Sequence, residues 1–200
     1  MAHHTAPPPV APAKLLKFND LWTNYPNNDP CVNTTTGKPA YDDQCAIRLG
    51  MALQKSGVNF KTFPGPVCEF GAPGSGMVLR AQELANWLLK RPFAGCPTPQ
   101  ILSPGKGFAE TLHGRTGIIF FEHYWLRSGE KLNANKAAPF GTGNHIDLWR
   151  IDTLTPAFHN FFRFTLHIDH FPSLNPLSPA GENWYSDLNN SARVLFWQIV

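Results

Sequence analysis

A cysteine at the start of a helical pattern and a distant histidine at the start of a strand pattern are the residues best suited to chemistry. Cys45 begins an apolar stretch with helical spacing, and the free N–H groups and partial positive charge of a helix N-terminus stabilise a thiolate. The same N–H groups can hold the oxyanion of an attacked carbonyl. His145 follows the sequence GTGN, and an imidazole can pair with a thiolate and later protonate a leaving amine. Taken singly, each residue has a plainer interpretation, a small buried hydrophobe and a core histidine.

Hydrophobic periodicity predicts the elements that hold these two residues. Helical spacing predicts a short helix within 17–28, a helix over 45–57 that Gly57 caps, and a helix over 78–90. Apolar or alternating runs predict strands over 117–121, 145–149, 161–168 and 194–199. In the second of these strands, His145, Asp147 and Trp149 share one face. Helices that precede strands, rather than alternating with them, indicate an α+β fold.

Length and composition indicate one folded domain with proline-stiffened loops. The chain has 200 residues, of which 12% are aromatic and 19 are proline, and this length supports a substantial core. Residues 1–16 are predicted to be a disordered Pro-rich lead, and residues 17–200 a single domain. The net charge of +3 comes from scattered side chains, which speaks against nucleic acid as a partner. We expect no membrane insertion, and synthesis in the cytoplasm without a Sec signal, because neither a long apolar stretch nor an apolar leader is present.

The four cysteines exclude two common metal and redox arrangements. No two of the cysteines are spaced as CxxC; they are Cys31, Cys45, Cys68 and Cys96. This spacing speaks against a zinc ribbon or a thioredoxin-like motif. Cys68 and Cys96 both lie in segments rich in Pro and Gly, where a cross-link would be useful, and we expect them to form a disulfide. The His167–His170 pair has Asp169 between its two histidines but no fourth ligand, so we expect no metal site. No cofactor is expected either.

The segments around these residues resemble a known family. YDDQCAIRLGMALQKSG, GRTGIIFF, NHIDLW and VLFWQI are similar to blocks of the type VI secretion amidase effector 4 family, and the resemblance extends from about Lys17 to Val200. It implies a papain-like, NlpC-type fold, in which the helix of the nucleophile packs on an antiparallel sheet. The aromatic C-terminus and the order of cysteine before histidine both match this arrangement.

The resemblance also implies an activity and its partners. Members of the family are cysteine peptidoglycan amidases (DL-endopeptidases) that cleave the bond between γ-D-glutamate and meso-diaminopimelate in the peptide stem. The type VI secretion machinery delivers them to the periplasm of a target Gram-negative cell, which then lyses. A cognate periplasmic immunity protein blocks the active site in the producing cell. Other interpretations are a different papain-like cysteine hydrolase or acyltransferase, such as a CHAP-type amidase, and a non-enzymatic binding domain.

By the same resemblance, Cys45 is the nucleophile and His145 the general base. The acid that orients the imidazole in the family lies about eleven residues after the histidine, and that spacing reaches Pro156 here. We therefore expect Asp152 to take this role, with Asp147 as the alternative. The remaining candidates are His159, Asn160 and a backbone carbonyl. Gln44, next to the nucleophile, has two interpretations: it contributes to the oxyanion hole, or it is a plain polar residue of the loop.

Overall fold

The computed structural model describes residues 15–103, 107–125, 130–131, 141–151, 153–154, 188 and 191–200. Most of the predicted lead (1–14) and the predicted strand 161–168 lie outside these residues. Within them, none of the helices is both long and apolar enough to cross a membrane.

Four helices are present in the described residues. They are α1 (Phe18–Asn24), α2 (Cys45–Lys55), α3 (Ala81–Leu89) and α4 (Phe108–Thr111). The first three confirm the helices predicted from periodicity. At the end of α2, Gly57 takes a φ of +103°, its N–H donates to the Gln54 carbonyl, and the Val58 N–H donates to the Leu53 carbonyl, which is the hydrogen-bond pattern of a Schellman cap. Helix α4 was not predicted, because four residues are too few to show a helical period.

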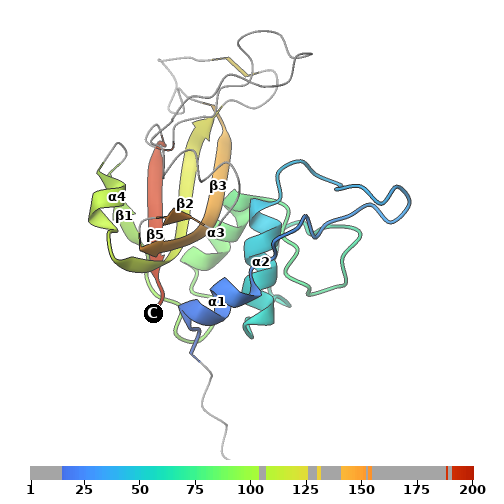
Figure 1. Ribbon diagram of the computed structural model, residues 1–200, viewed down its shortest axis with the longest axis horizontal. Helices are drawn as coiled ribbons and strands as arrows, with labels where there is room; N and C mark the ends of the chain where they lie inside the picture. The colour runs from blue at the N-terminus through green and yellow to red at the C-terminus, as the bar shows by residue number, and fades with distance from the viewer. Residues whose placement is uncertain are drawn as a thin grey trace, which may run out of the picture.

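The strands form one antiparallel sheet (Figure 1). They are β1 (Gln100–Leu102), β2 (Arg115–Trp125), β3 (Gly143–Ile151), β4 (Thr153–Leu154) and β5 (Arg193–Gln198). Their order in the sheet is β1-β5-β2-β3-β4. Strands β2, β3 and β5 confirm three of the predicted strands, whereas the two short strands at the edges were not predicted.

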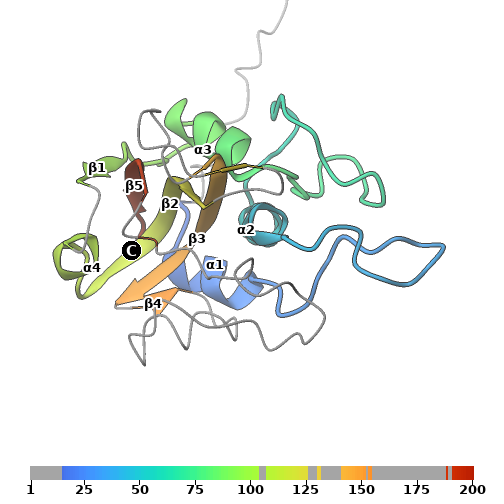
Figure 2. The same ribbon diagram turned by 90° about the horizontal axis from the view of Figure 1, so that it is seen from above.

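Helices cover both faces of the sheet (Figure 2). Helices α1, α2 and α3 pack on the face that carries Ile118 and Ile146, and α4 packs on the face that carries Phe121 and Trp149. A strand covered on both faces needs apolar side chains at successive positions, which explains the run GIIFF in β2. The sheet is therefore the central layer, and it fixes where α2 lies.

An irregularity in β2 shapes the end of the sheet next to His145. Phe121 pairs with His145, but the next pair joins Trp125 to Gly143, so β2 holds two more residues than β3 in this interval. In the bulged segment His123 has a φ of +54°, and its N–H donates to the Asn144 side chain at 2.8 Å. Bulges of this kind re-aim neighbouring side chains.

Two glycines let α2 touch the loop that follows it. A Cβ atom on Gly50 would overlap the backbone oxygen of Gly76, and a Cβ atom on Gly76 would overlap the backbone oxygen of Gly50. Gly76 also has a φ of +76°, a conformation that side chains disfavour. The helix and the loop are thus in contact backbone to backbone.

Candidate active site

The structure brings Cys45 and His145 together. Cys45 is the first residue of α2, and its thiol is free and half-buried. His145 lies on β3, against which α2 packs. The His145 side chain is 19% exposed, and Cys45 lies close enough to act on its pKa. A helix N-terminus and a strand from distant parts of the sequence thus form a cysteine–histidine pair, the arrangement used in nucleophilic catalysis by thiols.

A buried carboxylate lies beside the imidazole. Asp147 Oδ2 is 3.5 Å from His145 Nε2, and the Asp147 side chain is 2% exposed. Its other oxygen, Oδ1, accepts the Leu148 N–H at 2.8 Å, which fixes the orientation of the carboxylate. Of the two predicted orienting acids, Asp147 is therefore next to the ring, and Asp152 lies outside the described residues.

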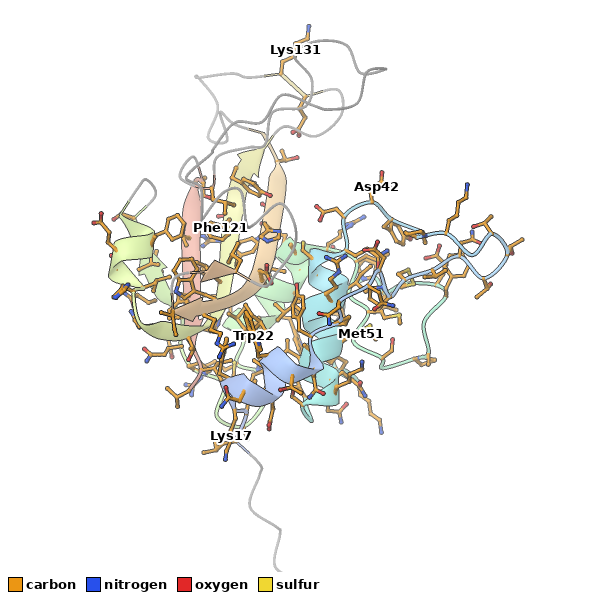
Figure 3. The ribbon with its side chains drawn as sticks, in the orientation of Figure 1. Lys17, Trp22, Asp42, Met51, Phe121 and Lys131 are labelled. Atoms are coloured by element: carbon orange, nitrogen blue, oxygen red, sulfur yellow. A yellow bond between two sulfur atoms is a disulfide. The ribbon has the colours of Figure 1, made fainter. Side chains whose placement is uncertain are left out.

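Two aromatic rings enclose the imidazole. The Phe121 ring stacks on it with centroids 6.4 Å apart and an interplanar angle of 27°, and Figure 3 labels Phe121 on the sheet. Tyr124 meets the same ring edge-on, also at 6.4 Å. Tyr124 comes from the bulged segment of β2, and the sequence offered no signal for its position because a bulge breaks the alternation of a strand.

The surroundings of His145 favour its charged form. Burial by itself lowers the pKa of the imidazole, but the negative charge of Cys45, hydrogen bonds to Asp147 and Cys45, and the nearby Tyr124 together raise this pKa well above 6.5. A protonated imidazole next to a thiolate is the reactive form of such a pair, because the thiolate attacks and the imidazolium holds the proton that the leaving group needs.

We expect a titration of the His145 ring by NMR to show this balance. In the wild type its pKa should lie well above 6.5, and it should fall in Cys45→Ala and in Asp147→Asn, since each variant removes a contribution that opposes burial. A raised pKa in the folded state means that the site stabilises the fold below the unfolded pKa and loses this contribution as pH rises through the folded pKa. The resonance of the His145 ring is assigned by its absence from the spectrum of His145→Asn. An unchanged pKa in both variants would contradict this account.

The predicted disulfide between Cys68 and Cys96 is wrong. Cys68 is bonded to Cys31, with Cα atoms 6.1 Å apart, and this cystine packs on the outer side of α2 against Ile47. Cys96 is free and belongs to the main core, where burial raises its pKa to about 11 against the opposing charge of Arg91. The sequence context of a cysteine shows that it lies in a loop, but not which other loop it meets.

The predicted oxyanion role of the Gln44 side chain is also wrong. Its amide nitrogen donates to the carbonyl oxygens of Cys31 and Tyr41, each at 3.1 Å. Because an amide NH₂ group has two hydrogens, no donor is left for a substrate. The backbone N–H groups at the start of α2 are the donors that lie nearest the thiol along the chain.

A comparison of the sequence with protein families gives a match to an amidase effector family. The family model described as "Type VI secretion system (T6SS), amidase effector protein 4" matches residues 41–197. No curated protein sequence matches the chain.

Solved structures show the same fold at low identity. The effector Tae4 from Salmonella typhimurium, in complex with the immunity protein Tai4 from Enterobacter cloacae, is 17% identical, with coverage of 92% of this chain and 99% of that chain and a TM-score of 0.53. Tae4 from Enterobacter cloacae is 13% identical, with coverage of 94% and 99% and a TM-score of 0.55. This likeness confirms the predicted papain-like, NlpC-type α+β fold.

Proposed function

Because the chain belongs to the type VI secretion amidase effector 4 family, we propose that it cleaves the γ-D-glutamyl–meso-diaminopimelate bond of peptidoglycan stems. The observation that carries the proposal is the proximity of Cys45, at the start of α2, to His145 on β3. The pair supplies a thiolate and a proton donor at one place, which is what hydrolysis of an amide requires.

In the first half of the reaction, the Cys45 thiolate attacks the carbonyl carbon of the γ-glutamyl amide. The backbone N–H groups at the start of α2 stabilise the oxyanion that forms. The His145 imidazolium then gives its proton to the amino nitrogen of diaminopimelate, and the C–N bond breaks. The products are a thioester on Cys45, a neutral imidazole and a free amine.

In the second half, the neutral imidazole of His145 takes a proton from water as the water oxygen attacks the thioester carbon. The thiolate leaves, so the carboxyl group of the stem is released and the thiolate–imidazolium pair is restored. Asp147 faces Nε2 of the ring, which leaves Nδ1 for the sulfur. Asp147 is thus a positioning residue that holds the ring in this orientation and stabilises its charge.

The place of action and the partner follow from the family. We propose that the type VI secretion machinery delivers the protein to the periplasm of a target Gram-negative cell, where stem cleavage causes lysis. The Tae4 effectors of Salmonella typhimurium and Enterobacter cloacae have been solved in complex with the immunity protein Tai4. By extension, a cognate immunity protein covers the Cys45–His145 site of this chain.

A digest of purified Gram-negative peptidoglycan, analysed by mass spectrometry, tests the proposal. Digestion with the wild type should produce stems with a new free amino group on diaminopimelate, and digestion with Cys45→Ala should produce none. Cys96→Ala is the matched control, because it removes the other free thiol and should cleave like the wild type. Iodoacetamide at pH 6 should label Cys45 rather than Cys96, whose raised pKa keeps it protonated.

The outcomes separate the proposal from its alternatives. Uncut stems together with selective labelling of Cys45 would contradict the proposed substrate. The protein would then be a cysteine hydrolase or acyltransferase of another specificity. Uncut stems without selective labelling would indicate a binding domain. Cleavage by Cys45→Ala would overturn the assignment of the nucleophile.

A further inference from the structure

The side chain before the nucleophile holds the start of α2 to a cross-linked loop. We propose that Gln44 is a positioning residue: by binding Cys31, it fixes where the Cys45 sulfur lies relative to His145. This inference rests on the proposed role of Cys45 as the nucleophile. Gln44 touches neither substrate nor oxyanion in this account. Its hydrogen bonds connect the start of α2 to the loop 31–41.

The contacts of Gln44 use every polar group of its amide. The side chain is buried, with 2% of the residue exposed. Its Oε1 accepts the Cys31 N–H at 2.8 Å, and its Nε2 donates to the Cys31 and Tyr41 carbonyl oxygens. The backbone carbonyl of Gln44 accepts the Arg48 N–H at 2.9 Å, so the same residue also begins the helix. Gln44 therefore connects the first turn of α2 to both ends of the loop 31–41.

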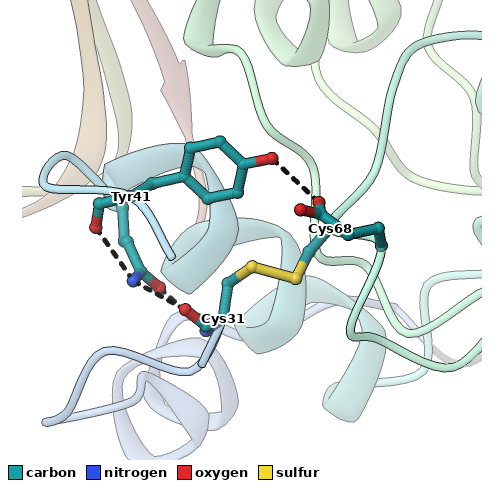
Figure 4. The surroundings of a disulfide bond; sticks show 5 residues. Cys31, Tyr41 and Cys68 are labelled. Carbon is teal, nitrogen blue, oxygen red and sulfur yellow. Dashed lines mark hydrogen bonds between the residues drawn. A yellow bond between two sulfur atoms is a disulfide. The ribbon is translucent and has the colours of Figure 1, made fainter. Parts of the chain in front are cut away.

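The loop 31–41, to which Gln44 is hydrogen-bonded, is itself linked to the loop after α2 (Figure 4). Cys31 is cross-linked to Cys68, which lies in the loop after α2. The Tyr41 hydroxyl donates to Glu69 Oε2 at 2.8 Å and so joins the same two loops a second time. Because the loops are tied to each other on the outer side of α2, the amide of Gln44 transmits a fixed position to the residue that follows it, Cys45.

This position matters because the two reactive side chains come from different elements. Cys45 is carried by α2 and His145 by β3, so the contact between sulfur and imidazole depends on where the helix starts relative to the sheet. A displacement of about 1 Å can cost roughly 10²-fold in rate. Loss of the Gln44 contacts should therefore slow the chemical step more than it weakens the binding of substrate.

The variant Gln44→Met tests this, because methionine has a similar length and makes none of the three hydrogen bonds. We expect kcat on stem peptides to fall about 10- to 100-fold while KM stays within about twofold. Alkylation of Cys45 by iodoacetamide should slow about tenfold at pH 6, where the rate depends on the pairing with His145. It should be unchanged at pH 9, where most free thiols are ionised in any case.

The control is Thr116→Val, which removes a 2.6 Å hydrogen bond from the Thr116 hydroxyl to the Ile199 carbonyl. This bond lies at the end of β2 away from His145, so the variant should lose stability but keep the wild-type kcat and alkylation rates. If Gln44→Met fails to fold, Gln44→Asn, whose neutral amide is one methylene too short to keep the contacts with Cys31, takes its place with the same expected losses.

The experiment distinguishes failure of the positioning role of Gln44 from failure of the proposed function. A wild-type kcat and a wild-type alkylation rate at pH 6 in the Gln44 variant would overturn the positioning role while the proposed function stands. If the wild type itself leaves stems uncut, the proposed function fails, and the alkylation rates at the two pH values still decide whether Gln44 positions Cys45.

Discussion

Replacing His145 with Asn is expected to lower kcat/KM for stem cleavage roughly 10³- to 10⁴-fold. The substitution removes both the partner that stabilises the Cys45 thiolate and the proton donor for the leaving amine. Asn is polar and smaller than His, so it fits the space beside Asp147 without a clash, and the fold should remain intact. Thermal unfolding monitored by circular dichroism checks this, and initial rates on purified stem peptides give the effect.

The pair should behave as one unit. Cys45→Ala is expected to fall to the same residual rate or below, and the double variant should be no slower than Cys45→Ala, because groups that act together are strongly non-additive. His113→Asn, at an exposed position before β2, is the control and should keep wild-type rates. A His145→Asn enzyme within tenfold of the wild type would rule out His145 as the base.

Reduction of the Cys31–Cys68 disulfide is expected to lower the free energy of unfolding by about 4 kcal/mol, because a cross-link restricts the conformations of the unfolded chain by closing a loop. The loop closed here joins residues 37 positions apart. For a chain of this length the loss corresponds to a decrease in Tm of roughly 10 °C. The rate of cleavage should fall as well, because Cys31 anchors the amide of Gln44.

Calorimetry with and without a phosphine reductant measures the effect on stability. The double variant Cys31→Ala, Cys68→Ala should match the reduced wild type and should not respond to reductant. Cys96→Ala should respond as the wild type does, since Cys96 is not cross-linked. An unchanged Tm after complete reduction, verified by thiol titration, would refute the stabilising role.

Much of the fold could be predicted because its main elements carry regular apolar patterns. The helical spacing in 45–57 and the run GIIFF identify α2 and β2 correctly, and the expected membership of the amidase effector family is confirmed. The short elements α4, β1 and β4 could not be predicted, because a single turn or a pair of residues has no period to detect. They are formed by packing against the long strands.

The candidate site could be predicted in part. Cys45 and His145 could be found because each begins a patterned element, and the structure brings them together. The cross-link could not be found, since the pairing of Cys31 with Cys68 depends on how two loops fold over α2. The hydrogen bonds of Gln44 could not be predicted for the same reason, because its partners lie in that loop.

The contact between Gly50 and Gly76 has a consequence for how this protein can diverge. A side chain at either position pushes the helix and the loop apart, so neither position accepts a change alone. A homologue that lacks one glycine must also have a displaced or shorter loop between Cys68 and Arg80. Recombination between such relatives should therefore exchange α2 and this loop as one block, with both crossover points outside residues 45–80.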